Sequence, residues 1–545
     1  MSSAAAVAQR EPPPLTSATP AIGWRAIAAP TVLAAVLAVI YLIWAPPSAD
    51  LAAQELRVWL FDQQGFNPWN GEWFGGHHTT GYSLLFPPLG SLLGARLVGA
   101  IATVASAALF AAITDRVWGD NSRVGSLWFG AAVSASLFNG RMTFALGIAV
   151  GLAAILAIQR DRRLLSYGLA LATGLASPVA AIFLALAGCA WAIADRRRLW
   201  VGIGLAAAAL AVPVVTALAF PEGGSEPFAL NAFLPVMVIS AVFVVVVSSD
   251  QRVLRTAAVL YALATCATFL LDTPVGGNVT RMCSLFAGPL LACALWEKRR
   301  LVLVVLAPIL IFFQLETPIH DVSRAQNDPA VSSSYYTPLL GFLDRESVHG
   351  PIRVEVLPTE DHWESRWVAV HYPIARGWVR QLDRRDGGLF YADQLDPVAY
   401  RKWIDLLAIG FVAVSSAPLD YAAVKEAELI KQGVPWLLPV FKSKQWSVYR
   451  VLRPTPLAAA PVTVTQLGIS TVSMVTPRAA SSILRVRFSP YWALVQGSGC
   501  VSRGPKGMTR VTLRQAGPAR LAIRFSLKRV FDRGPRCSNA TAASE

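Results

Sequence analysis

The sequence has little charge. Only 15% of its 545 residues are Asp, Glu, Lys or Arg, whereas about a quarter is usual for a soluble globular domain. The apolar fraction is 54% and the mean hydropathy is +0.48. These values exclude an ordinary soluble enzyme and a disordered chain, and they indicate an integral membrane protein.

Several chemical signatures are also missing. The sequence has no G-x-S-x-G nucleophile elbow, no Walker loop and no dinucleotide fingerprint, so a serine hydrolase and a nucleotide-driven pump lack support. None of the six cysteines stands in the spacing of a zinc site. The net charge is +15, but the basic residues fall in short breaks between apolar runs and in the C-terminal tail. We therefore expect no nucleic acid partner, and anionic membrane lipids instead.

Apolar runs separated by polar breaks continue up to residue 316. Because a bilayer core requires roughly 20 helical residues, they predict an α-helical polytopic membrane bundle of about 11 spans over residues 21–316. Three shorter helices, one of them re-entrant in an alternative reading, are expected between 124 and 176. The clearest runs are 26–46, 86–113, 178–194, 199–219, 229–248, 254–271, 282–296 and 301–315.

The breaks fall into two sets that differ in charge. The basic set comprises 116–123, 160–163, 195–198, 250–255 and 297–300. The other set comprises 45–85, 139–141, 177–178, 221–227 and 272–281. The positive-inside rule places the basic set in the cytoplasm. We therefore expect a multi-pass plasma membrane protein with a cytoplasmic N-terminus and an extracytoplasmic C-terminal domain. Residues 1–20 lack the apolar core of a signal peptide and are expected to be a disordered cytoplasmic tail.

The chain after residue 316 has ordinary polarity and divides by pattern. Residues 317–349, with prolines and a serine run, are expected to be a linker. Residues 350–455 mix short strands and helices, which predicts an external α/β domain, and 456–545 alternate apolar and polar residues between turns, which predicts a β-sandwich-like domain. Cys500 and Cys537 lie in this last part, where an oxidising exterior permits a disulfide.

The long first external loop, 45–85, carries the clearest chemistry. Asp50 follows the first span directly, and a carboxylate at the membrane boundary is costly unless it is hydrated, paired or bound to a metal. Glu72, His77 and His78 follow in a Trp- and Gly-rich stretch. Adjacent residues on a strand face opposite sides, so the two histidines are not expected to share one metal.

This layout resembles the GT-C superfamily of polytopic glycosyltransferases, which includes bacterial arabinofuranosyltransferases and in which an acidic residue after the first span opens a large external loop. Asp50 stands at the acidic position, QGFNPWNGEW at a G…W stretch, and Tyr82 with Pro87 and Pro88 at the start of the second span. No second acidic residue adjoins Asp50, unlike the paired acids of a two-carboxylate metal site. The chain also resembles uncharacterised actinobacterial membrane proteins that share its GGN…R and HWES…ARGW.RQLD stretches.

The resemblance implies inverting transfer of a sugar from a polyprenyl-phosphate donor to a cell-envelope glycan or lipid acceptor at the external face. Asp50, with Glu72 as a second candidate, would act as the catalytic base, or Asp50 would bind a divalent cation at the donor phosphate. Arg141 and Arg281 would bind the leaving phosphate. Asn278 belongs to the GGN turn before Arg281, whose glycines would let backbone N–H groups approach the phosphate.

The external segment 360–391 interleaves aromatic and charged residues, a composition that suits carbohydrate binding. Its candidates for binding the acceptor or a glycan are His362, Glu364, Arg376 and Trp378. The alternative is an ordinary soluble domain whose aromatic residues form its core.

Structural roles remain open for the loop residues as well. Asp50 would then cap a helix or pair with Arg57, Arg141 would extend from a short helix to the interface, and Arg281 would pair with Asp272. Two other functions also remain, namely a lipid or solute transporter or flippase, and a non-catalytic envelope scaffold that binds glycan. The scarcity of charged residues inside the spans disfavours the transporter.

Overall fold

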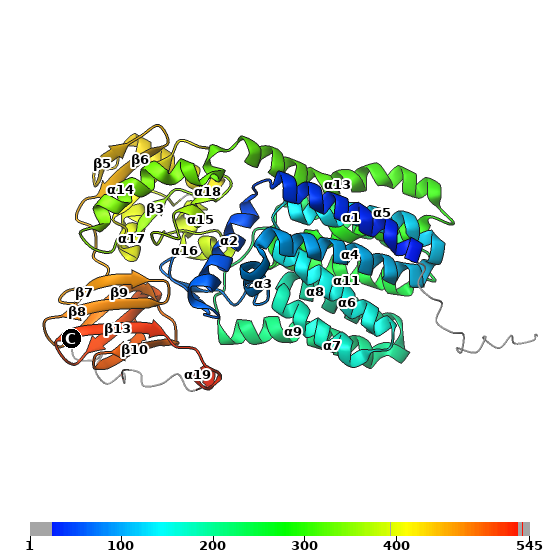
Figure 1. Cartoon of the computed structure of the whole chain (residues 1–545), viewed down its shortest axis with the longest axis horizontal. Helices are drawn as coiled ribbons and strands as arrows, with labels where there is room; N and C mark the ends of the chain where they lie inside the picture. The colour runs from blue at the N-terminus through cyan, green and yellow to red at the C-terminus, as the bar shows by residue number, and fades with distance from the viewer. Residues whose placement is uncertain (1–23, 393, 532–536, 538–545) are drawn as a thin grey trace, which may run out of the picture.

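The computed structural model describes residues 24–392, 394–531 and Cys537. It consists of a long helical bundle and two β-containing domains that lie together at one end of the bundle (Figure 1). The tail expected at residues 1–20 lies outside the described residues.

The bundle consists of eleven helices in the described part of the chain, where the sequence predicted about 11 spans. Seven helical segments are long and apolar enough to cross a membrane. One of them, Ala95–Phe138, comprises two helices, α4 and α5. Two shorter apolar helices, α8 and α10, and helix α7 complete the bundle. The helices are α1 (Trp24–Trp44), α4 (Ala95–Trp118), α5 (Arg123–Phe138), α6 (Met142–Gln159), α7 (Arg163–Ala176), α8 (Pro178–Ala194), α9 (Leu199–Ala219), α10 (Leu230–Val246), α11 (Arg252–Leu270), α12 (Thr280–Leu295) and α13 (Arg300–Asn327).

The two sets of polar breaks lie at opposite ends of this bundle. At the end next to the β-containing domains, Leu84 N–H donates to Leu175 O at 2.8 Å and Glu226 N–H donates to Thr273 O at 3.0 Å. At the other end, the Asn121 amide donates to Glu297 at 3.0 Å. The charge pattern therefore separated the ends correctly, and the assignment of the basic end to the cytoplasm stays a prediction of the positive-inside rule.

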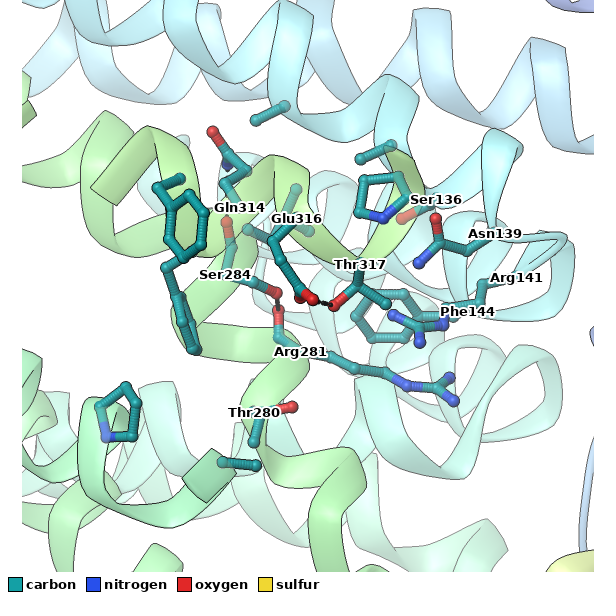
Figure 2. A pocket seen from close by; sticks show the side chains of 18 of the residues that line it. Ser136, Asn139, Arg141, Phe144, Thr280, Arg281, Ser284, Gln314, Glu316 and Thr317 are labelled. Carbon is teal, nitrogen blue, oxygen red and sulfur yellow. Dashed lines mark hydrogen bonds between the residues drawn. The ribbon is translucent and has the colours of Figure 1, made fainter. Parts of the chain in front are cut away.

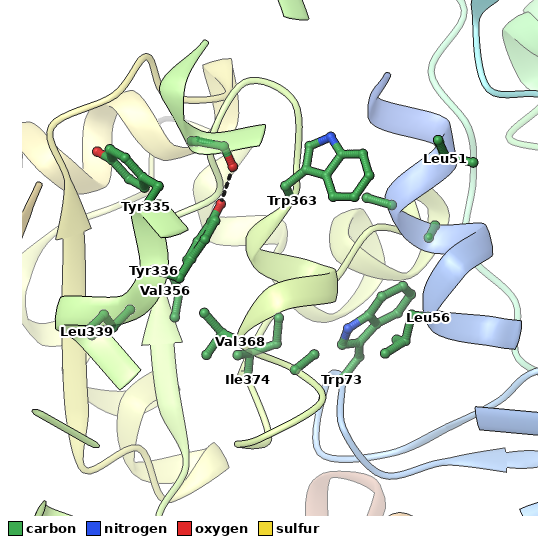
Figure 3. Close-up of a cluster of buried hydrophobic side chains, with 14 of the residues drawn as sticks. Leu51, Leu56, Trp73, Tyr335, Tyr336, Leu339, Val356, Trp363, Val368 and Ile374 are labelled. Carbon is green, nitrogen blue, oxygen red and sulfur yellow. Dashed lines mark hydrogen bonds between the residues drawn. The ribbon is translucent and has the colours of Figure 1, made fainter. Parts of the chain in front are cut away.

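The first external loop is folded rather than extended. Helix α2 (Ala49–Gln64) begins at the predicted membrane boundary and contains Asp50 in its first turn. The short strands β1 (Trp69–Asn70) and β2 (His77–His78) then pair in antiparallel register, and α3 (Phe86–Leu93) leads to α4. In α2, Leu51, Leu56 and Leu60 recur at helical spacing and are buried. Figure 3 shows Leu56 next to Trp73 and Leu51 on the opposite side of the helix. Both leucines belong to one buried cluster that includes Trp363, so α2 packs on the external domain.

The segment 317–349 is not the linker that the sequence predicted. Helix α13 continues through it to Asn327, and α14 (Thr337–Ser347) buries Leu339, Phe342 and Leu343. The prolines and serines form two 3-10 turns, η4 (Pro329–Val331) and η5 (Ser333–Tyr336). The buried Tyr336 hydroxyl donates to Ala330 O at 2.9 Å (Figure 3). The apolar spacing of α14 outweighs the local turn composition, because burial of that face fixes the whole segment.

The α/β domain is built on one mixed sheet of strand order β3-β4-β6-β5. Strands β3 and β4 are parallel, and the other two pairs are antiparallel. The strands are β3 (Val354–Val356), β4 (Phe411–Ser415), β5 (Leu437–Lys442) and β6 (Trp446–Val451). The helices are α15 (Glu364–Trp367), α16 (Arg380–Asp386), α17 (Pro397–Leu407) and α18 (Tyr421–Gln432). This is the predicted α/β fold, with α14 added.

The last domain has two antiparallel sheets around a shared apolar core, as the alternating pattern predicted. One sheet has the order β10-β13-β8-β7 and the other β11-β12-β9. A disulfide joins Cys500 and Cys537, the pair expected from the sequence. The elements are β7 (Thr463–Gly468), β8 (Thr471–Thr476), β9 (Ala480–Arg487), β10 (Trp492–Gln496), β11 (Gly499–Arg503), β12 (Met508–Leu513), β13 (Gly517–Ile523) and the short helix α19 (Leu527–Phe531).

The orientation can be tested with two single-cysteine variants in intact cells. Ser333→Cys lies at the end with the external domains and is exposed, and Arg162→Cys is exposed at the basic end. We expect a membrane-impermeant maleimide to label residue 333 in intact cells and residue 162 only after permeabilisation. Labelling of residue 162 in intact cells, with residue 333 protected, would reverse the topology.

Candidate functional site

Three candidates separated widely in the sequence meet at the bundle end that faces the α/β domain. Asp50 lies in the first turn of α2, Arg141 precedes α6, and Arg281 lies in the first turn of α12. Asp50 Oδ2 is 3.3 Å from Arg141 Nε and 3.8 Å from a terminal nitrogen of Arg281. All three side chains are half-buried. Two cations thus contact one carboxylate at the membrane boundary, where an unpaired charge would be costly.

The turn that carries Arg141 is held directly against α2. The buried side chain of Gln54 donates to Gly140 O, and its Oε1 accepts from Thr143 N at 3.1 Å. Gly140 adopts φ +72°, and a Cβ there would collide with Ser48 and the Leu51 backbone. A glycine is therefore required at this position. The position of Arg141 relative to Asp50 is fixed by these contacts.

Arg141 and Arg281 line a cavity of about 380 Å³ between α5, α10, α12 and α13. Figure 2 shows the two guanidinium groups on the same side of it, with Phe144 beside them. The Arg281 guanidinium lies 5.7 Å from the centre of the Phe144 ring. The wall combines polar and apolar side chains, so the cavity suits an amphiphilic molecule. Its other lining residues include Ser136, Asn139, Asn231, Pro235, Thr280, Ser284, Leu285, Phe312, Phe313, Gln314, Glu316 and Thr317.

A second carboxylate, Glu226, approaches this cluster from the loop between α9 and α10. Burial raises its pKa to about 7, although the nearby Arg281 opposes the shift, and Asp50 is close enough to raise it further. The loop is fixed by the bond from Glu226 N–H to Thr273 O, 3.0 Å, and by Gly277 N–H, which donates to Pro227 O at 3.2 Å. The loop therefore holds Glu226 within range of the charges of Arg281 and Asp50, with its pKa raised to near neutral.

The GGN turn does not supply the free backbone N–H groups expected for phosphate. Gly276 N–H donates to Thr273 Oγ1 at 3.1 Å, Gly277 N–H to Pro227 O, and Asn278 N–H to Val275 O at 2.9 Å. Gly276 packs so closely on the Glu226 backbone that a Cβ would collide with it. The glycines thus serve the packing of two loops, and Asn278 is not among the residues that line the cavity.

The donor set at Asp50 does not fit a divalent cation. Magnesium and similar ions take several oxygen ligands, whereas Asp50 contacts two guanidinium groups. In the described part of the chain, no three His, Cys, Asp or Glu side chains gather in a geometry that would hold a metal. No step is therefore assigned to a metal at Asp50.

Glu72 lies away from this cluster, between the first loop and the external domain. The backbone N–H of Glu72 donates to Asn70 Oδ1 at 2.9 Å, and its carbonyl oxygen accepts from Ile374 N–H at 2.8 Å. Burial raises the pKa of Glu72 to about 8, opposed only by Arg353. The structure therefore does not bring Glu72 together with Asp50, although the sequence paired them as base candidates.

The adjacent histidines do face different surroundings, as expected for a strand. The His77 ring stacks on Trp73 with centroids 5.8 Å apart, and burial lowers its pKa to about 3. His78 Nδ1 lies 2.6 Å from Glu222 Oε1, and its Nε2 lies 3.0 Å from Ser489 Oγ. His78 therefore connects the first loop to the loop before α10 and to the β-sandwich.

The acceptor candidates of the external domain form a buried network. His362 lies 3.4 Å from Glu364 and 3.3 Å from Asp420, and Trp378 stacks on its ring at a centroid distance of 3.6 Å. Burial lowers the pKa of His362, but hydrogen bonds to the two carboxylates outweigh it and raise the pKa above its usual value. Of the four candidates, His362, Glu364 and Arg376 are buried, and only Trp378 is partly exposed.

Arg376 is held within this domain by two carboxylates and by a bond to Ala422 O at 3.4 Å. Its guanidinium binds Asp383 with contacts of 2.6 and 2.8 Å and lies 3.4 Å from Glu426. These bonds occupy the Arg376 guanidinium within the folded domain, so the side chain has a structural role. The neighbouring Arg380, which the sequence did not single out, binds Asp420 at 2.7 Å, and its charge opposes the rise that burial causes in the pKa of Glu226.

Sequence reasoning thus missed Glu226 and Arg380. Glu226 lies in the break 221–227, which had been assigned to the same membrane side as Asp50. An acidic residue in any such break is a candidate partner of Asp50, since breaks on one side of a bundle converge. Arg380 carried no comparable signal, because its place depends on how the α/β domain packs on the bundle.

The chain was compared with family models, with curated proteins and with solved structures. No family model matches the sequence, and no curated protein is similar to it. Among solved structures, the chain is similar to the arabinofuranosyltransferase AftD from Mycobacteria, with 15% sequence identity and a TM-score of 0.48. The similarity covers 96% of this chain and 44% of that protein, so the chain spans less than half of its length.

We expect Gln54→Ala to loosen the turn that carries Arg141. The variant leaves Gly140 O and Thr143 N–H buried without their partner, which costs about 1–3 kcal/mol. The thermal unfolding temperature of the purified protein should fall. Gln63→Ala, at an exposed position of the same helix, is the control and should leave it unchanged. Equal effects of the two substitutions would show that the Gln54 contacts do not hold the turn.

We expect Glu72→Gln to change the dependence of stability on pH. The raised pKa means that the folded state keeps the Glu72 proton between pH 4.5 and about 8 while the unfolded state has lost it. The wild type therefore loses stability over this window as pH rises, by at most about 1.4 kcal/mol per pH unit from this group.

The Gln variant lacks this titration, so its loss of stability between pH 5 and 8 should be smaller than that of the wild type. Chemical denaturation at several pH values measures the difference. Parallel pH profiles for the two proteins would rule out a protonated Glu72 in the fold.

Proposed function

We propose that the protein is an integral membrane glycosyltransferase that uses a polyprenyl-phosphate sugar donor and acts on a cell-envelope glycan or lipid at the external face. The observation that best supports this proposal is the contact of Asp50 with Arg141 and Arg281, beside an amphiphilic cavity at the membrane boundary. This places a base candidate next to two phosphate-binding candidates, which is what such a transfer requires.

The arginines bind the donor phosphate in this proposal. A phosphodiester oxygen competes with Asp50 for the two guanidinium groups, and charge-assisted bonds to phosphate are strong. The apolar part of the wall, with Phe144 and Phe312, contacts the first isoprenoid units. The exchange of partners frees the Asp50 carboxylate as the donor binds.

Asp50 then accepts the proton of the acceptor hydroxyl. The hydroxyl oxygen forms a bond to the anomeric carbon from the face opposite the phosphate, and the bond between that carbon and the phosphate oxygen breaks. The electron pair leaves with the polyprenyl phosphate, whose added negative charge the arginines stabilise. The products are an inverted glycoside and the lipid phosphate.

Glu226 receives the proton from Asp50 in the return step. Its pKa of about 7 allows it to take up and release a proton near neutral pH. A carboxylate held beside the base by the loop 220–229 removes the proton without moving the arginines.

The acceptor enters from the side of the external domain. Trp378 is the partly exposed member of the network, and His362 fixes its ring by stacking. An aromatic ring held in this way suits contact with a sugar face. In this proposal His362, Glu364 and Arg376 position the wall of the acceptor site rather than touching the acceptor.

We expect Asp50→Asn and Asp50→Ala to lower the transfer rate by roughly a hundredfold to ten-thousandfold, since both remove the base. The assay uses full-length protein in membranes with a panel of polyprenyl-phosphate sugars and measures labelled glycan product. Asp62→Asn, on the exposed face of the same helix, is the matched control and should retain activity. Unchanged transfer in both Asp50 variants would refute the base.

The same membranes separate the other functions. Movement of the intact donor between the two leaflets, with no glycan product formed, would favour the transporter. Binding of envelope glycan with no turnover of any donor would favour the scaffold.

A further inference from the structure

The end of the β-sandwich next to the membrane bundle carries an exposed apolar segment, residues 524–531. It follows strand β13 and includes helix α19. Leu527 is 79% exposed and Phe531 is 91% exposed. Two large side chains so open to water on a short helix are costly unless another surface covers them.

The same segment is basic. Arg524 and Lys528 are exposed and Arg529 is half-buried. The sequence from 502 to 531 contains no acidic residue. Apolar and cationic side chains are therefore mixed within these eight residues. This composition is typical of a segment that lies in a membrane interface.

The segment is anchored at the end of a membrane-spanning helix. The Tyr491 hydroxyl donates to the O atom of Ala219, the last residue of α9, at 2.9 Å. Arg524 N–H donates to Tyr491 O at 2.9 Å, and the Phe525 ring lies 5.2 Å from that of Phe220. The segment therefore begins at the level where α9 leaves the bilayer.

The exposed face of α9 continues toward the segment. Val214, Val215 and Leu218 near the end of α9 are exposed on the bundle surface, where lipid chains cover such residues. Figure 1 shows α19 extending from the sandwich toward the bundle, beside the end of α9. The apolar side chains of α19 thus continue the lipid-facing surface.

We propose that residues 524–531 form a membrane anchor that binds anionic phospholipids of the surrounding bilayer. Leu527 and Phe531 insert among the headgroups and upper acyl chains, while Arg524, Lys528 and Arg529 bind the lipid phosphates. The occupant is lipid rather than protein, because the segment adjoins the lipid-facing side of a spanning helix and carries only positive charge. This contact holds the sandwich against the membrane and does not depend on the transfer reaction.

Photo-crosslinking of the full-length protein in nanodiscs tests the anchor. The photoreactive residue p-benzoylphenylalanine replaces Phe531 or, as a control, Val398, which is 62% exposed on α17 of the α/β domain. Mass spectrometry then measures phospholipid adducts in nanodiscs of phosphatidylglycerol or phosphatidylcholine. We expect at least about fivefold more adduct at 531 than at 398, and more with the anionic lipid.

A second variant tests the role of charge. Lys528→Gln with Arg529→Gln should lower the adduct yield at 531 about fivefold or more in the anionic nanodiscs and leave it unchanged in the zwitterionic ones. These side chains are on the surface, so the unfolding temperature should stay constant. Equal yields at 531 and 398, a crosslink from 531 to protein, or equal yields in the two lipids would overturn the proposal.

Discussion

The burial of helix α2 between the bundle and the external domain is the constraint on which the site depends. Leu51 and Leu56 are completely buried and join one apolar core with Trp73, Trp363 and residues of the bundle. Full burial of each leucine contributes about 1.5–3 kcal/mol. Because the same helix begins with Asp50, the packing that joins the two parts of the protein also sets the position of the carboxylate. The external domain is therefore part of the site and not an appendage to it.

The electrostatics of the cluster follow from that position. One carboxylate, Asp50, faces two guanidinium groups, and Glu226 is mostly protonated only below its pKa of about 7. Arg57, which the sequence offered as an alternative partner, instead places its guanidinium 3.8 Å from the centre of the Tyr82 ring. The two guanidinium groups thus lie next to a partly apolar cavity, which Glu316 also lines. That combination favours an anionic headgroup with an apolar tail over a neutral solute.

Much of the fold and part of the site could be predicted from the sequence because hydrophobic periodicity and charge act over short stretches. The separation of the bundle ends placed Asp50, Arg141 and Arg281 on one side, and the helices then brought them together. Composition failed at 317–349, where the buried face of α14 outweighed the turn-forming residues. It also failed for the GGN turn, since the use of Gly277 N–H by Pro227 is a contact between distant loops.

The β-sandwich is connected to the cluster around Asp50 through side-chain contacts of His78 and Glu222. Burial raises the pKa of Glu222, but His78 outweighs it through hydrogen bonds and charge and lowers the pKa to about 2, so Glu222 is ionised. Glu222 also lies 3.1 Å from Arg385, while His78 contacts Ser489 of the sandwich.

These contacts fix one end of the loop 220–229, and the bonds of Glu226 and Pro227 to the segment 273–277 fix the other. A shift of the sandwich relative to α9 would therefore move Glu226 relative to Asp50. Since the sandwich docks on the last residue of α9 through Tyr491, its attachment at the membrane boundary determines how closely the second carboxylate approaches the first.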